Sequence, residues 1–182
     1  MLTLWDLIEP VSRLLAPRRQ PASPPRPARP PAQRSPIPTA TPIPARKPTA
    51  TDRYESIARE LLATHNIRVR KWRKSSSGVA VVVTYRNGAI TRYIESPRPR
   101  GPLSMAIFLH EIGHHVFGVG SIEPRCLEEY HAWMFALREM ESRRLNVTDS
   151  VRRRVHKSLA YAVRKAQRRG LKQLPTELRA YT

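Results

Sequence analysis

The chain has 182 residues, and its 33 lysines and arginines against 14 aspartates and glutamates give a formal net charge of +19. This length suits one domain of ordinary size, and a single cysteine, Cys126, excludes an intrachain disulfide framework. No apolar run approaches the roughly 18 residues that a membrane-spanning helix needs, and the first residues lack the basic region of a secretory signal. We therefore expect an intracellular protein of the cytoplasm, or of the nucleoid, without a membrane span.

The first 50 residues differ in composition from the rest. Residues 1–16 carry large apolar side chains at helical spacing, which predicts a short amphipathic helix. Residues 17–50 hold most of the 18 prolines together with many arginines, which predicts a disordered linker of extended conformation. The short helix either docks on the folded part of the chain or binds a partner.

Four later segments repeat apolar residues at helical spacing and predict helices: 51–67, 103–117, 127–143 and 148–170. The first helix begins at Thr51 or Asp52, both of which are N-cap residue types. Gly170 follows the last apolar repeat and ends the last helix.

Two stretches between the first and second helices predict strands. Residues 67–72 alternate in polarity, and residues 78–96 form two β-rich runs joined by Asn87-Gly88. This dipeptide predicts a hairpin with a type I′ turn. With one helix before three antiparallel strands and three helices after them, the chain is expected to be an α+β protein.

The residues from His110 to His114 read HEIGH, an HExxH motif within the second predicted helix. Side chains four residues apart on a helix lie one above the other, so both imidazoles can bind one zinc ion at about 2.0–2.1 Å. Glu111 points about 100° away from His110. It is near enough to accept a proton from a water that the metal activates. The alternative is a buried helix whose histidines have ordinary hydrogen-bond partners.

The helix around the motif is apolar on every side, which predicts that it is buried. Gly113 lies inside it, where glycine costs roughly 1 kcal/mol relative to alanine. Such a cost is acceptable if another chain segment must come close. Ala132 and Ala136 of the next predicted helix are small enough to allow this, so we expect these two helices to pack tightly.

A catalytic zinc site has three protein ligands and one open position. The predicted helix 127–143 offers Glu128, Glu129 and His131 as the third ligand. Glu128 is our first choice and Glu129 the second. His131 competes with both because imidazole is as good a ligand, and it can orient a ligand from behind if it does not bind metal.

The chain here resembles the ImmA/IrrE-type gluzincin metallopeptidases. The likeness covers residues 52–140 and is strongest at residues 107–118, around the sequence HEIGHHVFG. It implies a zincin-like minimal metallopeptidase domain over residues 51–145. The basic residues and helical spacing beyond this domain predict a basic C-terminal helical extension over residues 146–182. The resemblance also implies an endopeptidase that cleaves a protein substrate, such as a DNA-bound regulator.

The resemblance assigns roles within the motif: His110 and His114 bind Zn²⁺, and Glu111 is the general base. In this family a glutamate on the next helix is the third ligand. The sequence HAWMFA puts His131 at that position unless the match shifts to Glu128 or Glu129. A histidine in this role would look more like the SprT-type proteases that act on DNA-bound proteins.

Zincins in general bind their substrate as an additional strand along the sheet edge beside the metal. Residues 89–96, AITRYIES, lead toward the HExxH helix and are the expected edge strand.

Eight basic residues surround the narrow apolar stripe of the last predicted helix: Arg152, Arg153, Arg154, Lys157, Arg164, Lys165, Arg168 and Arg169. Such density attracts phosphate without sequence specificity. We expect either a solvated charged face or weak, salt-sensitive contact with nucleic acid. The alternative function is therefore a basic nucleic-acid-associated protein whose metal site is inactive or structural. By contrast, residues 101–145 carry four basic and six acidic groups.

Overall fold

The computed structural model describes residues 49–182, and the expected helix at 1–16 and nearly all of the expected linker at 17–50 lie outside this range. Its first element, helix α2, spans Ala50–Thr64 and begins one or two residues earlier than expected. Thr49, not Thr51 or Asp52, is the N-cap. Asp52 instead occupies the third helical position, where its carboxylate accepts a hydrogen bond from Thr49 N at 2.6 Å. This reciprocal capping box satisfies two backbone donors that the helix cannot satisfy itself.

Three strands follow: β1 (Ile67–Arg73), β2 (Val79–Thr84) and β3 (Ile90–Pro97). They form one mixed sheet in the order β1-β3-β2, in which β1 is parallel to β3 and β2 is antiparallel to it. The expected all-antiparallel sheet is therefore wrong. The loop after β1 carries the chain past one strand position, and β3 enters that position. As the central strand, β3 buries Ile94, Glu95 and Ser96.

The hairpin between β2 and β3 closes where it was expected, but with a different turn. Tyr85 O accepts a hydrogen bond from Gly88 N at 2.9 Å, and Tyr85 N donates to Ala89 O at 2.9 Å. Only Gly88 of the pair Asn87-Gly88 has a positive φ, of 79°. A type I′ turn needs a positive φ at both residues, so that prediction is wrong.

Glu95 is the buried charged residue of the sheet. Its carboxylate accepts hydrogen bonds from Arg70 Nε at 2.7 Å and Arg73 Nε at 2.9 Å, both from β1. These two hydrogen bonds, against a smaller opposing effect of burial, lower the pKa of Glu95. The parallel pairing of β1 with β3 thus brings charge partners to the one carboxylate on the central strand.

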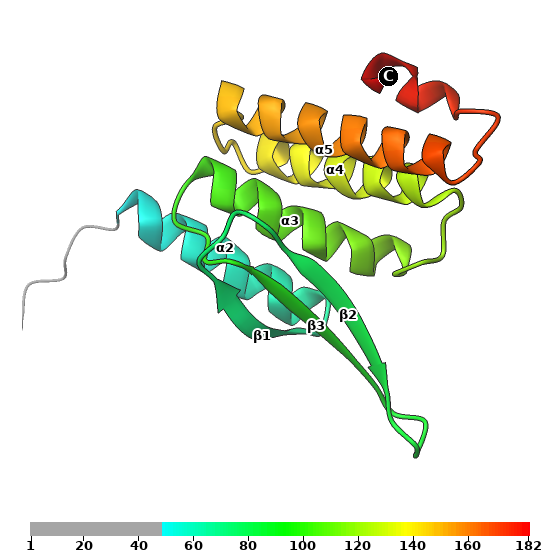
Figure 1. The fold of residues 1–182 in the computed structure, drawn as a ribbon. Coiled ribbons are helices and arrows are strands. Elements are labelled where there is room, and N and C mark those ends of the chain that lie inside the picture. The colour runs from blue at the N-terminus through cyan, green and yellow to red at the C-terminus, as the bar shows by residue number, and fades with distance from the viewer. Residues whose placement is uncertain (1–48) are drawn as a thin grey trace, which may run out of the picture. The chain divides into compact units, whose positions relative to one another are not determined.

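The remaining elements are helical: α3 (Pro102–Phe117), α4 (Arg125–Ser142), α5 (Asp149–Arg168) and the 3₁₀ helix η2 (Thr176–Tyr181). The sheet and α2 lie on one side of α3, and α4 and α5 lie on the other (Figure 1). Thr148 caps α5, and Gly170, with a φ of 93°, follows its end as expected. None of the helices in residues 49–182 is both long and apolar enough to cross a bilayer.

Helix α3 is the centre of the core. Every residue from Met105 to His115 is buried, which confirms the prediction from its uniformly apolar surface. The close approach of α4 at Gly113 is also confirmed. A Cβ added at Gly113 would lie 2.9 Å from Ala132 O, 3.0 Å from Ala132 Cα and 3.2 Å from Phe135 Cδ1. Glycine at this point lets the backbones of the two helices come together.

Candidate metal centre

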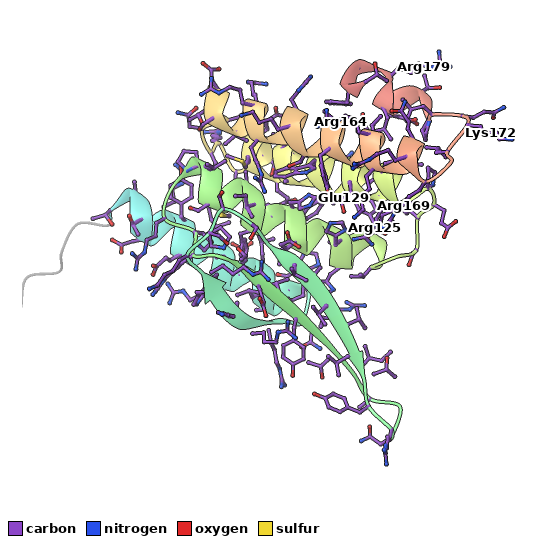
Figure 2. All side chains as sticks on the ribbon, in the orientation of Figure 1. Arg125, Glu129, Arg164, Arg169, Lys172 and Arg179 are labelled. Atoms are coloured by element: carbon purple, nitrogen blue, oxygen red, sulfur yellow. The ribbon has the colours of Figure 1, made fainter. Side chains whose placement is uncertain are left out.

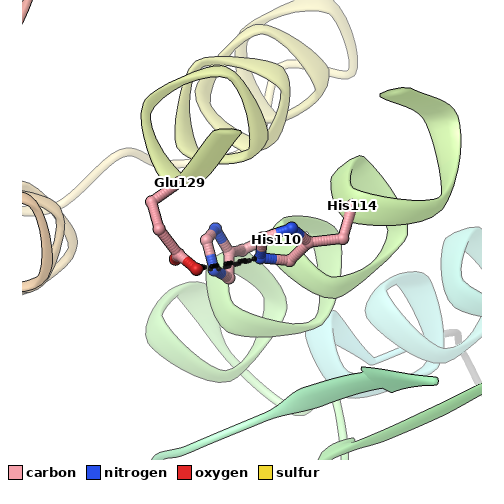
Figure 3. Close-up of side chains that lie close together, drawn as sticks. All are labelled: His110, His114 and Glu129. Carbon is pink, nitrogen blue, oxygen red and sulfur yellow. Dashed lines mark hydrogen bonds and ion pairs between the residues drawn. The ribbon is translucent and has the colours of Figure 1, made fainter. Parts of the chain in front are cut away.

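Two histidines of α3 and one glutamate of α4 converge on a single point (Figure 3). The Nε2 atoms of His110 and His114 are 3.2 Å apart. The carboxylate of Glu129 lies 3.3 Å from His110 Nε2 through Oε2 and 3.6 Å from His114 Nε2 through Oε1. Ligands of a tetrahedral zinc ion at about 2.0–2.1 Å are separated from one another by about 3.4 Å. The three groups therefore have the spacing that a zinc ion requires.

Glu128 forms a hydrogen bond with the Nδ1 side of the His114 ring, opposite the Nε2 atom that faces His110. Its Oε1 accepts a hydrogen bond from His114 Nδ1 at 2.7 Å, and its side chain is completely buried. Its Oε2 accepts from Gly120 N at 2.9 Å and from an Arg125 guanidinium nitrogen at 3.0 Å. Because Nδ1 donates its hydrogen to this carboxylate, Nε2 is the ring nitrogen of His114 that can bind a metal ion. This carboxylate–histidine arrangement is the usual support for metal ligands.

His110 is positioned by packing. The indole of Trp133 stacks on its ring, with centroids 4.2 Å apart and planes inclined by 24°. His110 Nδ1 is buried and has no hydrogen-bond partner. Burial, the largest effect, lowers the pKa of His110 to about 4. The imidazole is therefore neutral near pH 7, which is the state that binds a metal ion.

Glu129 and His114 each shift the pKa of the other. Burial raises the pKa of Glu129, but its hydrogen bonds to His110 and His114 outweigh this and hold the pKa well below its usual range. Burial lowers the pKa of His114, but the neighbouring carboxylates, Glu129 first among them, outweigh this and raise it. The pair thus favours the charged form of each side chain more than a free histidine or glutamate would.

Glu111 lies beside the ligands and is buried as well. Burial, opposed by the positive charge of His114, raises the pKa of Glu111 to about 7. The backbone of Gly78, one residue before β2, passes directly over its side chain. A Cβ added at Gly78 would overlap Oε1, Cγ and Cδ of Glu111. The loop before β2 therefore lies against the carboxylate, and a larger residue at position 78 would displace it.

The ligands open onto a cavity of about 230 Å³. Its walls come from four segments of the chain. The loop before β2 contributes Ser77 and Gly78, and α3 contributes Ile107, His110 and Glu111. Helix α4 contributes Glu129 and Trp133, and α5 contributes Arg154, Ser158, Tyr161 and Ala162. The cavity can hold a side chain or a short piece of backbone beside the metal ligands.

The structure brings four of the expected site residues together: His110, Glu111, His114 and Glu129. Glu128, the first choice for the third ligand, instead contacts the far side of His114 and does not face the other two ligands. His131 lies two residues beyond Glu129, which places it about 200° away around α4. It packs against Phe117 and Tyr130 and is outside the cluster.

The basic residues of α5 divide into two groups. Seven of the eight named above are exposed, with Arg154 as the exception. The side chains drawn in Figure 2 show Arg164, Arg169, Lys172 and Arg179 on the α5 and η2 side of the molecule, while Arg125 and Glu129 lie together on α4. Arg154 belongs to the metal site and not to this charged face.

Three residues of the site were not expected from the sequence. Trp133 follows Glu129 by four positions and therefore shares its helix face, a signal that was present in the spacing. Gly78 reads only as the first residue of a strand, and nothing in the sequence relates it to Glu111. The sequence does not distinguish Arg154 from the other arginines of α5. Its position near α3 depends on how α5 packs against the core.

No protein-family model, curated protein or solved structure matches this chain.

Proposed function

We propose that this protein is a zinc-dependent endopeptidase with a zincin-like core. The observation that carries the proposal is the convergence of His110, His114 and Glu129 at zinc-ligand spacing, with the carboxylate of Glu111 buried beside them at a cavity. A histidine pair and one carboxylate form a known set of catalytic zinc ligands, which leaves one coordination position open. The resemblance to the ImmA/IrrE-type peptidases supports a protein substrate, with a DNA-bound regulator as the expected kind.

A zinc ion at this point would act as a Lewis acid that acidifies water and polarises a peptide carbonyl. The protein residues then have separate tasks. His110, His114 and Glu129 would hold the ion, while Glu128 fixes the ring orientation of His114. Trp133 covers His110 and excludes water from that side of the ring.

Glu111 is the group that moves protons. It accepts one proton from the attacking water and passes it to the nitrogen of the departing amine, so that one water molecule is consumed for each peptide bond broken. A carboxylate with a pKa raised by burial is suited to both steps, because it neither loses nor retains the proton too strongly near neutral pH. A nearby dication lowers this pKa and favours the basic form at the start of the reaction.

The substrate is expected to bind along β2. Residues 89–96 are not the edge strand that their sequence predicts, because β3 lies in the middle of the sheet and has no free edge. Strand β2 is an edge strand, and the two residues before it line the cavity. An extended peptide that pairs with the free edge of β2 passes the metal ligands at the point where Gly78 covers Glu111.

The test compares the wild-type protein with Glu111→Gln. Each protein is purified, its zinc content is measured, and cleavage of fluorescein-labelled casein and of a mixed peptide library is followed by fluorescence and mass spectrometry. We expect one zinc per chain and the same melting temperature in both proteins, with cleavage by the wild type alone. Equal cleavage by the variant, or a wild-type protein without stoichiometric zinc, would refute the proposal.

The second candidate is a basic nucleic-acid-associated protein in which the metal is structural. The exposed basic residues of α5 favour it, because α5 carries a single acidic residue, Asp149. This function predicts that stoichiometric zinc occurs without cleavage of any library peptide. It also predicts retention on DNA at low salt that falls steeply as salt is raised. SprT-like activity would instead appear as cleavage that DNA stimulates.

A further inference from the structure

Arg154 is the cationic residue from α5 in the wall of the metal-site cavity. It lines this cavity together with His110 and Glu129. Its Nε atom is buried and has no hydrogen-bond partner. Its side chain therefore shares one cavity with two of the three candidate metal ligands.

The position of Arg154 follows from the periodicity of α5. The helix buries Val151, Val155, Leu159 and Val163 against the core. Arg154, Ser158 and Tyr161 follow one another at spacings of four and three, so they form a polar stripe beside this apolar one. All three line the cavity. The packing of α5 thus fixes one polar stripe opposite the HExxH helix.

Glu129, one of the two carboxylates in the cavity wall, already has other partners. Glu129 contacts both histidines and, at 3.4 Å, Arg125 Nε. Glu111 is covered by the backbone of Gly78. A buried N–H group of a charged side chain that lacks an acceptor is costly. An acceptor from outside the chain would remove this cost, and a guanidinium is best matched by an anionic oxygen.

We propose that Arg154 donates a hydrogen bond to a negatively charged oxygen of the peptide bound at the metal site. This inference rests on the proposed peptidase function. Two parts of a peptide supply such an oxygen: a carboxylate, from an acidic side chain or the C-terminus, and the oxyanion that forms at the scissile carbonyl. A cation beside a metal ion makes the cavity selective for anionic groups.

The test uses the full chain loaded with Co²⁺, whose absorption changes when a hydroxamate binds it. The probes are the monohydroxamates of malonate, succinate and glutarate, together with their uncharged methylamides. The hydroxamate binds the metal while the distal carboxylate reaches a different depth in each. We expect the wild type to bind one of the acids about 10-fold to 100-fold more tightly than its amide. Arg154→Met should abolish this preference.

Arg153→Met is the matched control, because Arg153 is the neighbouring arginine of α5 and is exposed. It removes the same charge and should keep the preference. A phosphinic dipeptide without other acidic groups mimics the oxyanion at the scissile carbonyl and tests whether Arg154 binds that group instead. If Arg154→Met weakens binding of this phosphinic dipeptide, and the hydroxamate probes show no preference for the acid over the amide, the partner is the oxyanion. In that case kcat falls for all substrates alike. A carboxylate partner raises KM for acidic substrates only.

The outcomes separate the two proposals. If Co²⁺ binds and Arg154→Met changes the affinity for neither kind of probe, the role of Arg154 is refuted while the metal site stands. If Co²⁺ does not bind stoichiometrically, the peptidase proposal fails, and the role of Arg154 fails with it. Equal melting temperatures of the two arginine variants show that a loss of affinity is not a loss of fold.

Discussion

Replacing Gly113 with alanine tests the link between helix packing and metal binding. The added Cβ would lie 2.9 Å from Ala132 O and 3.0 Å from Ala132 Cα. Carbon atoms in good contact are about 3.5–4.0 Å apart. Because the obstructing atoms belong to the backbone of α4, no side-chain rotation relieves the overlap. Helix α4 must therefore move away from α3 by about 0.5 Å.

This displacement has a small effect on stability and a large one on the site. Overpacking costs about 1–3 kcal/mol, and alanine returns roughly 1 kcal/mol of helix propensity, so the metal-free protein loses about 0–2 kcal/mol. Metal–ligand distances tolerate only about 0.2 Å. Since Glu129 lies on α4 and both histidines lie on α3, a shift of about 0.5 Å separates the ligands. We expect zinc affinity to fall at least about tenfold, the size of effect seen when a ligand loses its support.

The assay is competition for Zn²⁺ with a chromophoric chelator, combined with thermal denaturation of the metal-free and metal-loaded protein. Gly101→Ala is the control, because Gly101 caps the same helix and a Cβ there meets no atom within 4 Å. It should leave the zinc affinity unchanged. A Gly113→Ala protein that melts at a higher temperature and binds zinc as the wild type does would refute the packing argument.

Three further results are expected. Glu129→Gln should lose stoichiometric zinc. Glu128→Gln should keep one zinc per chain and bind it about 10-fold to 100-fold more weakly in chelator competition. Loss of zinc from the Glu128 variant and its retention by the Glu129 variant would make Glu128 the ligand. Gly78→Ala should displace the carboxylate of Glu111, so that casein cleavage falls while the measured zinc content stays at one per chain. Glu95, whose folded-state pKa is lowered, contributes stability above its unfolded pKa of about 4.3, and this contribution is lost as the pH falls. Melting temperatures measured from about pH 7 down to pH 3 should therefore fall less steeply in Glu95→Gln than in the wild type.

Features set by near neighbours in the chain could be predicted from the sequence. The burial of α3, the contact at Gly113 and the end of α5 at Gly170 all follow from local spacing and side-chain size. The pairing of the two motif histidines follows from the pitch of one helix. Each of these depends on a few residues within one helix, or within two helices that are adjacent in the chain.

Features set by the rotation or order of whole elements could not be predicted. Glu128 and Glu129 point about 100° apart, so the choice of the third ligand depends on how α4 is rotated about its axis. That rotation follows from the contact of Ala132 with Gly113. The insertion of β3 between β1 and β2 depends on which strand covers α3 best, and the alternating sequences alone do not reveal this.

The candidate site combines a local part and a distant part, and this division has a consequence for its function. The three metal ligands come from two helices joined by a short loop, between residues 110 and 129. The cavity walls come from the loop before β2 and from α5, which are far away in the chain. Changes in these walls can alter which peptide binds without removing a metal ligand. On the proposed function, we therefore expect variants of Ser158 and Tyr161 to change substrate preference at constant zinc affinity. The candidate ligands lie on α3 and α4 alone, so a cation would be held without α5, which would only face a bound peptide.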